Sequence, residues 1–94
     1  MINSFRCKET EKIFNREFSK KLTEKIQSIA FRKLRMLNRA NTGNDLKVPP
    51  ANHLEQLSGN SKGQLSIRIN DQYRICFNWA NGETTNVEIV DYHK

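Results

Sequence analysis

The chain has 94 residues, 36% of them hydrophobic, with a formal net charge of +6 and a pI near 9.6. This length predicts one domain, residues 1–94, with a modest core and little room for a large cofactor. The charge favours an acidic partner, which can be nucleic acid, an anionic membrane surface or an acidic protein. No stretch approaches the roughly 20 apolar residues of a membrane span, and the start lacks the apolar core of a signal peptide, so we expect a cytoplasmic protein.

The first half of the chain is patterned mainly for helices. Residues 2–7 alternate in polarity and can form a short first strand. Apolar residues at helical spacing then predict one helix over residues 10–18 and a longer one over residues 22–37, with Gly43 closing the helical region. Lys25, Arg32, Arg35 and Arg39 lie largely off the apolar stripe. This basic row is either a solvated helix face or a contact surface for nucleic acid or an acidic protein.

The middle of the chain carries turn and loop signals. Asn, Gly and Asp residues and the Pro49-Pro50 pair predict a loop over residues 41–51, and residues 53–57 predict a short strand. A turn with two glycines and Lys62 follows, but it lacks the spacing of a phosphate-binding P-loop. Cys7 and Cys76 have neither metal-ligand spacing nor a secretory context, so we expect two reduced thiols and no metal or cofactor.

Two hairpins are predicted in the last third of the chain. Matching the apolar faces of residues 64–70 and 73–79 pairs Ile67 with Ile75 and sets Arg68 opposite Arg74, with a three-residue loop between the strands. For the second hairpin, pairing Ile75 with Val87 requires a loop of residues 80–82 with Gly82 in the left-handed conformation. This register places Glu88 opposite Arg74 and Tyr92 opposite Asn70.

The two registers together gather Arg68, Asn70, Arg74, Glu88 and Tyr92 on one polar face. Facing arginines repel each other, so Glu88 or a bound anion must offset them. One interpretation is a surface ion pair between Arg74 and Glu88 with a spare arginine. The alternative is a phosphodiester site, because the planar fork of arginine suits phosphate.

Three segments of the sequence then resemble a known family: residues 57–68, residues 73–77, and the hydrophobic run 87–90 that ends in Asp91-Tyr92-His93. They are similar to HigB-type toxins of the RelE/ParE superfamily. The resemblance implies an α+β fold in which two N-terminal helices pack on one face of a small, mostly antiparallel sheet. It also implies metal-independent, ribosome-dependent cleavage of mRNA, a HigA-type helix-turn-helix antitoxin, and contact with operator DNA through the antitoxin complex.

The resemblance carries over residue by residue. Arg74, Asp91, Tyr92 and His93 match family positions linked to catalysis, and Arg68 stands two residues from the family's arginine but on the same face. The histidine and lysine that some members carry near the second strand are here Glu55 and Ser58. His53 lies nearby, two residues from the expected place. We take these as RNA-binding candidates: Lys62, Asn70, Arg32 and Arg35.

The resulting hypothesis is cleavage by the ribose 2′-hydroxyl. Arg68 and Arg74 would stabilise charge on the phosphorane, His93 would protonate the leaving oxygen, and Asp91 would orient His93 or help hold the C-terminus. Tyr92 would orient the nucleotide by stacking or share proton transfer. Two other functions stay open: a ParE-like toxin that binds DNA gyrase without catalysis, and a basic RNA-binding module.

Overall fold

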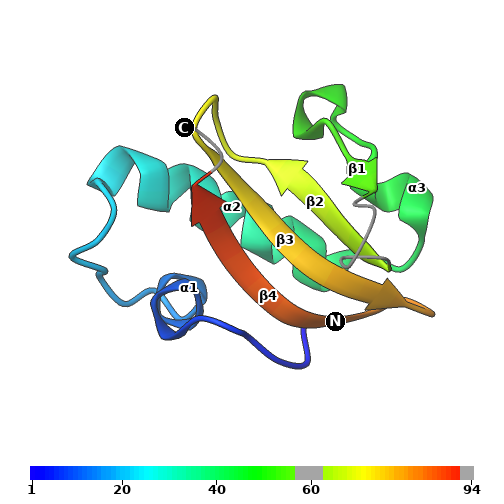
Figure 1. Ribbon diagram of the computed structural model, residues 1–94, viewed down its shortest axis with the longest axis horizontal. Coiled ribbons are helices and arrows are strands. Elements are labelled where there is room, and N and C mark those ends of the chain that lie inside the picture. The colour runs from blue at the N-terminus through cyan, green and yellow to red at the C-terminus, as the bar shows by residue number, and fades with distance from the viewer. Residues whose placement is uncertain (57–62, 92–94) are drawn as a thin grey trace.

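The computed structural model describes residues 1–56 and 63–91. Its helices and strands lie in two layers (Figure 1). Their order in the chain is α1 (Lys8–Phe14), α2 (Glu24–Arg39), α3 (Gly43–Leu46), the 3₁₀ helix η1 (Pro50–Asn52), β1 (Glu55–Gln56), β2 (Gln64–Arg68), β3 (Tyr73–Ala80) and β4 (Glu83–Asp91). The strands form one antiparallel sheet in the order β1-β2-β3-β4. The predicted α+β fold, with two N-terminal helices against a small sheet, is confirmed.

The core lies between α2 and one face of the sheet. Thr23 caps α2 by accepting a hydrogen bond from the Ile26 backbone N–H at 3.2 Å, and the helix then runs behind the sheet in Figure 1. Its apolar stripe meets alternate residues of the central strands, as the strand period of two requires. The buried residues of this cluster include Ala30, Leu34, Leu37, Ile67, Ile75, Phe77 and Val87.

Residues 2–7, predicted as a short first strand, do not form a full strand. Ile2 and Phe5 make isolated parallel bridges to Thr84 and Val87 of β4. Four backbone hydrogen bonds of 2.7–3.2 Å support these bridges, so the segment lies along the edge of β4 without becoming a fifth strand.

The predicted ends of the helices are also corrected. Helix α1 ends at Phe14, and Phe18, the last residue of the predicted helix, is 63% exposed. Gly43 begins a helix and does not close one: Thr42 and Asp45 form a reciprocal capping box at the start of α3. The predicted loop over residues 41–51 thus contains α3 and part of η1.

The first hairpin has the predicted register, and the second does not. Ile67 pairs with Ile75, and Arg68 with Arg74. In the second hairpin Ile75 pairs with Ile89 instead of Val87, because the turn is one residue shorter than predicted and a bulge between Cys76 and Asn78 shifts the pairing by one residue more. The loop shortens to Asn81-Gly82, whose φ angles of 52° and 80° suit a type I′ turn.

A buried asparagine organises the connection between α3 and β1. Asn52 is fully buried, and its Nδ2 donates to the carbonyl oxygens of Leu46 at 3.1 Å and Val48 at 3.3 Å. Its Oδ1 accepts a hydrogen bond from the Nζ of Lys33 on α2. Asn52 therefore ties this connection to the helix layer and fixes where the chain enters β1.

Replacing Asn52 with alanine should lower the free energy of unfolding by about 2 kcal/mol or more, because the buried carbonyl of Leu46 and the partly buried carbonyl of Val48 lose their donor. Urea unfolding followed by circular dichroism measures this change. The matched control is Asn44→Ala, at an exposed position of α3, which should change stability by less than about 0.5 kcal/mol. Equal stability of the two variants would contradict the structural role of Asn52.

Candidate functional site

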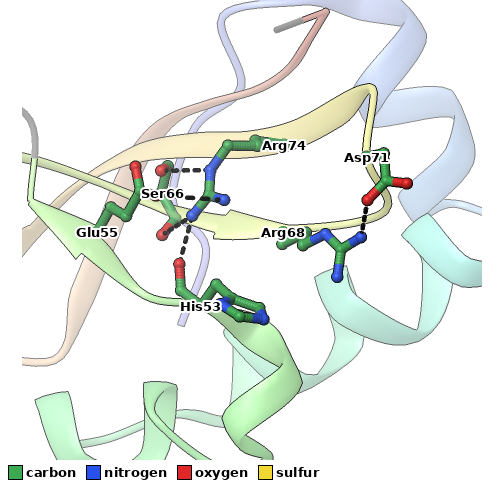
Figure 2. Close-up of polar contacts among 6 residues, drawn as sticks. All are labelled: His53, Glu55, Ser66, Arg68, Asp71 and Arg74. Carbon is green, nitrogen blue, oxygen red and sulfur yellow. Dashed lines mark hydrogen bonds and ion pairs between the residues drawn. The ribbon is translucent and has the colours of Figure 1, made fainter. Parts of the chain in front are cut away.

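The face of the sheet opposite α2, which we call the open face, holds a buried arginine at its centre. Arg74 on β3 is 7% exposed, and Figure 2 shows its guanidinium enclosed by Ser66, His53 and Glu55. Its Nε donates to Ser66 Oγ at 2.9 Å, and its NH2 group donates to the carbonyl oxygens of Ser66 and His53. Glu55 makes an ion pair with NH1 at 3.7 Å. A charge this buried requires such partners, which also fix its orientation.

The segment leading into β1 supplies two of these partners through its backbone shape. His53 has a left-handed φ of 44°, and this turn follows η1 directly. The turn presents the His53 carbonyl to Arg74 and leads into Glu55, which is exposed at the start of β1. A carboxylate and a guanidinium therefore lie together on the open face.

Arg68 is the second cation of the open face. It lies opposite Arg74 in the register of β2 and β3, as predicted. Its guanidinium contacts the carboxylate of the exposed Asp71 (Figure 2). Such an exposed pair contributes little to stability and yields readily to a competing anion.

One predicted contact of the cluster, between Glu88 and Arg74, is corrected by the register of β4, and the other, between Tyr92 and Asn70, involves a residue outside the described ranges. Glu88 lies opposite Cys76 and pairs with Arg6 at 3.3 Å, while Val90 lies opposite Arg74. Glu55, and not Glu88, supplies the negative charge beside Arg74. The sequence predicted Glu55 on the second strand but did not link it to Arg74.

Asp91 lies on the helix-facing side of the sheet. It is paired with Tyr73 across β3 and β4, so strand alternation places its side chain on the face opposite to Arg74. Its Oδ2 accepts a hydrogen bond from Gln72 Nε2 at 3.1 Å. The structure therefore does not bring the Asp91 carboxylate together with the two arginines.

The predicted RNA-binding residues fall in different places. Asn70 shapes the turn between β2 and β3, because its Oδ1 accepts the backbone N–H groups of Gln72 at 2.9 Å and Tyr73 at 2.8 Å. Arg35 lies over the ring of Phe31, 6.0 Å from its centroid. Arg32 lines a groove together with Arg68. Of the two helix arginines predicted to bind RNA, Arg32 is thus the one that lines a groove with Arg68.

Three predicted site residues, Lys62, Tyr92 and His93, lie outside the described residues. Within residues 1–56 and 63–91, no group of three or more His, Cys, Asp or Glu side chains is placed to hold a metal ion. Among the helices of the same ranges, none has the length and apolarity needed to cross a bilayer.

Sequence reasoning missed the groups that hold Arg74. Ser66 carried a usable signal, since it alternates with the core residues Leu65 and Ile67 and lies two residues from Arg68 on the same face. The sequence gives no signal for the His53 carbonyl, because the direction of this carbonyl depends on a left-handed backbone conformation that a histidine residue does not predict.

Comparisons with known proteins show which family the chain resembles. A family model described as the RelE-like toxin of the type II toxin-antitoxin system HigB matches residues 3–93. Toxin HigB-1 of Vibrio cholerae serotype O1 is 46% identical over 69 residues, which cover 73% of this chain and 72% of that protein.

Two solved structures are similar in fold. The YoeB-YefM toxin-antitoxin complex from Staphylococcus aureus contains a chain that aligns with a TM-score of 0.63 and 20% identity, over 100% of this chain and 99% of that one. A YafQ mutant from E. coli aligns with a TM-score of 0.60 and 13% identity, over 98% of this chain and 92% of that one. From the family match and the Vibrio relative, the chain belongs to the HigB-type family of RelE-superfamily toxins of type II toxin-antitoxin systems.

Proposed function

We propose that this toxin is a metal-independent endoribonuclease that cleaves mRNA on the ribosome and so inhibits translation. The observation that carries the proposal is the pair of arginines on the open face, where Arg74 is held by Ser66 and His53 with Arg68 opposite. A fixed guanidinium beside a second, weakly engaged one suits a phosphate that gains negative charge in the transition state.

The proposed reaction begins with attack of the ribose 2′-hydroxyl on the adjacent phosphate. The 2′-oxygen forms a bond to phosphorus, the bond to the 5′-oxygen breaks, and the products are a 2′,3′-cyclic phosphate and a 5′-hydroxyl. Arg74 stabilises the phosphorane with a guanidinium that Ser66 and His53 already orient, and Arg68 adds a second positive charge once the phosphate displaces Asp71. No water is consumed in this step.

We assign proton transfer to Glu55 and to residues at the C-terminal end of the chain. Glu55 is a carboxylate paired with Arg74, and it would accept the proton of the 2′-hydroxyl of a nucleotide bound beside that arginine. His93 would donate a proton to the leaving 5′-oxygen, since imidazole titrates near neutral pH. Tyr92 would stack on the nucleotide or share the proton transfer, and Asp91 would support His93 from the end of β4.

The proposed partners follow from family membership and charge. A HigA-type antitoxin with a helix-turn-helix would neutralise the toxin and carry it to operator DNA, while the ribosome would present the mRNA. The net charge of +6 favours both an acidic antitoxin segment and the polyanionic ribosome. In the Staphylococcus aureus relative, YoeB forms a complex with its antitoxin YefM.

Changing Arg74 to lysine tests the proposed site. Lysine keeps the charge but cannot reproduce the bonds to Ser66 and His53, so the single-turnover cleavage rate should fall about 10²- to 10³-fold. Purified toxin, ribosomes and a translated mRNA provide the assay, with the chemical ends of the products identified. Arg16→Lys, at an exposed position after α1, is the matched control and should cleave like the wild type. Undiminished cleavage by a folded Arg74→Lys variant would remove Arg74 from the site.

Changing His93 to alanine tests the proposed general acid. The cleavage rate should fall about 10²- to 10⁴-fold, as expected for loss of a proton-transfer group. The remaining activity should no longer depend on a group that titrates between pH 5 and 8. Lys94→Ala removes the neighbouring charge and should retain both the rate and its pH profile. A His93→Ala variant with the wild-type profile would contradict this role.

A further inference from the structure

A groove between α2 and the end of β2 joins cations from two layers of the fold. Arg32 and Lys33 of α2 and Arg68 of β2 line this groove, which has a volume of about 390 Å³. Ile29, Met36, Pro49 and Ile69 supply apolar surface in the same groove. Small-molecule sites in proteins typically have volumes of about 300–1,000 Å³ and combine apolar walls with a few polar groups.

The charges of the groove are incompletely balanced by the protein. Lys33 donates to the neutral side chain of Asn52, and among the described residues no carboxylate lines the groove. Burial, followed by the adjacent Arg32 charge, lowers the pKa of the Lys33 ammonium. Arg68 contacts Asp71, which is exposed outside the groove lining. An anion bound here would reduce the repulsion between Arg32 and Lys33 and offset the cost of burying Lys33.

The groove is continuous with the proposed catalytic surface. Arg68 lies opposite Arg74 on the open face, and the same residue lines the groove toward α2. Figure 2 shows the Arg68 guanidinium directed toward Asp71, whereas the Arg74 guanidinium is bonded to Ser66 in the middle of β2. An extended nucleic-acid strand that passes Arg74 can therefore place a neighbouring nucleotide beside α2.

We propose that this groove is a second RNA subsite that binds one nucleotide next to the scissile one, with its phosphate between Arg32, Lys33 and Arg68. The ribose or base would lie against Ile29, Met36 and Ile69. The inference rests on the proposed nuclease function but concerns binding, so it is tested without cleavage. It assigns RNA contact to Lys33, which no sequence pattern singled out.

The test measures binding of a fluorescein-labelled 2′-O-methyl RNA hexamer, which lacks the attacking hydroxyl and cannot be cleaved by the proposed reaction. Fluorescence anisotropy at several salt concentrations gives both the Kd and its salt dependence. Arg32→Gln and Lys33→Gln should each weaken binding about three- to tenfold at 0.1 M salt and reduce the magnitude of the salt slope by about 0.7, the value for one phosphate contact on a single strand. Lys8→Gln, on α1 and outside the groove, is the charge-matched control and should change neither.

Two outcomes would overturn the subsite. One is an Arg32→Gln variant with unchanged RNA affinity and salt slope, which is decisive even if Lys33→Gln unfolds, because Arg32 is exposed. The other is weaker binding of the antitoxin with unchanged RNA affinity, which would assign the groove to an acidic protein segment. A toxin that binds the hexamer through the groove but never cleaves mRNA would refute the nuclease proposal and leave the subsite in place.

Discussion

The buried guanidinium of Arg74 sets the main constraint on the open face. A charge that is 7% exposed must be surrounded by acceptors, and the fold provides them from β2 and from the segment before β1. The ladder between β2 and β3 supplies Ser66, and the left-handed turn at His53 supplies a carbonyl. Arg74 thereby connects the sheet to the segment at His53 that leads into β1. The orientation of the Arg74 guanidinium is fixed before any ligand binds.

The same arrangement links the stability of the fold to the proposed chemistry. Lys33 of α2 holds Asn52, Asn52 holds the carbonyls of Leu46 and Val48, and the chain then turns at His53 to meet Arg74. This series of hydrogen bonds joins the helix layer to the open face around the edge of β2. Preorganised donors of this kind are effective because they are not rearranged when charge develops in the transition state.

Strand parity explains how much of the site was readable from sequence. The pairing of Arg68 with Arg74 followed from matching two apolar faces, and the structure has it. The predicted pairing of Arg74 with Glu88 is wrong. A bulge and a two-residue turn shift β4 by two residues relative to β3, which leaves Glu88 on the same face of the sheet but opposite Cys76. Bulges change register without changing the polarity pattern of a strand, so no count of alternating residues detects one here.

Other errors came from backbone conformations that composition does not reveal. Phe18 fitted the helical period but lies beyond the end of α1, and Gly43 reads as a terminator although Thr42 and Asp45 start a helix there. The family resemblance supplied the overall layer order and is confirmed, whereas the partners of Arg74 depended on tertiary contacts between residues 53–55 and β3.

A map of cellular 5′ ends after brief induction tests whether this toxin breaks mRNA by attack of the 2′-hydroxyl. The proposed reaction should produce new ends within translated regions that carry a 5′-hydroxyl, so they enter the sequencing library only after enzymatic phosphorylation. These ends should disappear when the antitoxin is co-expressed. Growth arrest with unchanged mRNA ends and DNA damage would contradict the account and indicate a toxin that binds gyrase.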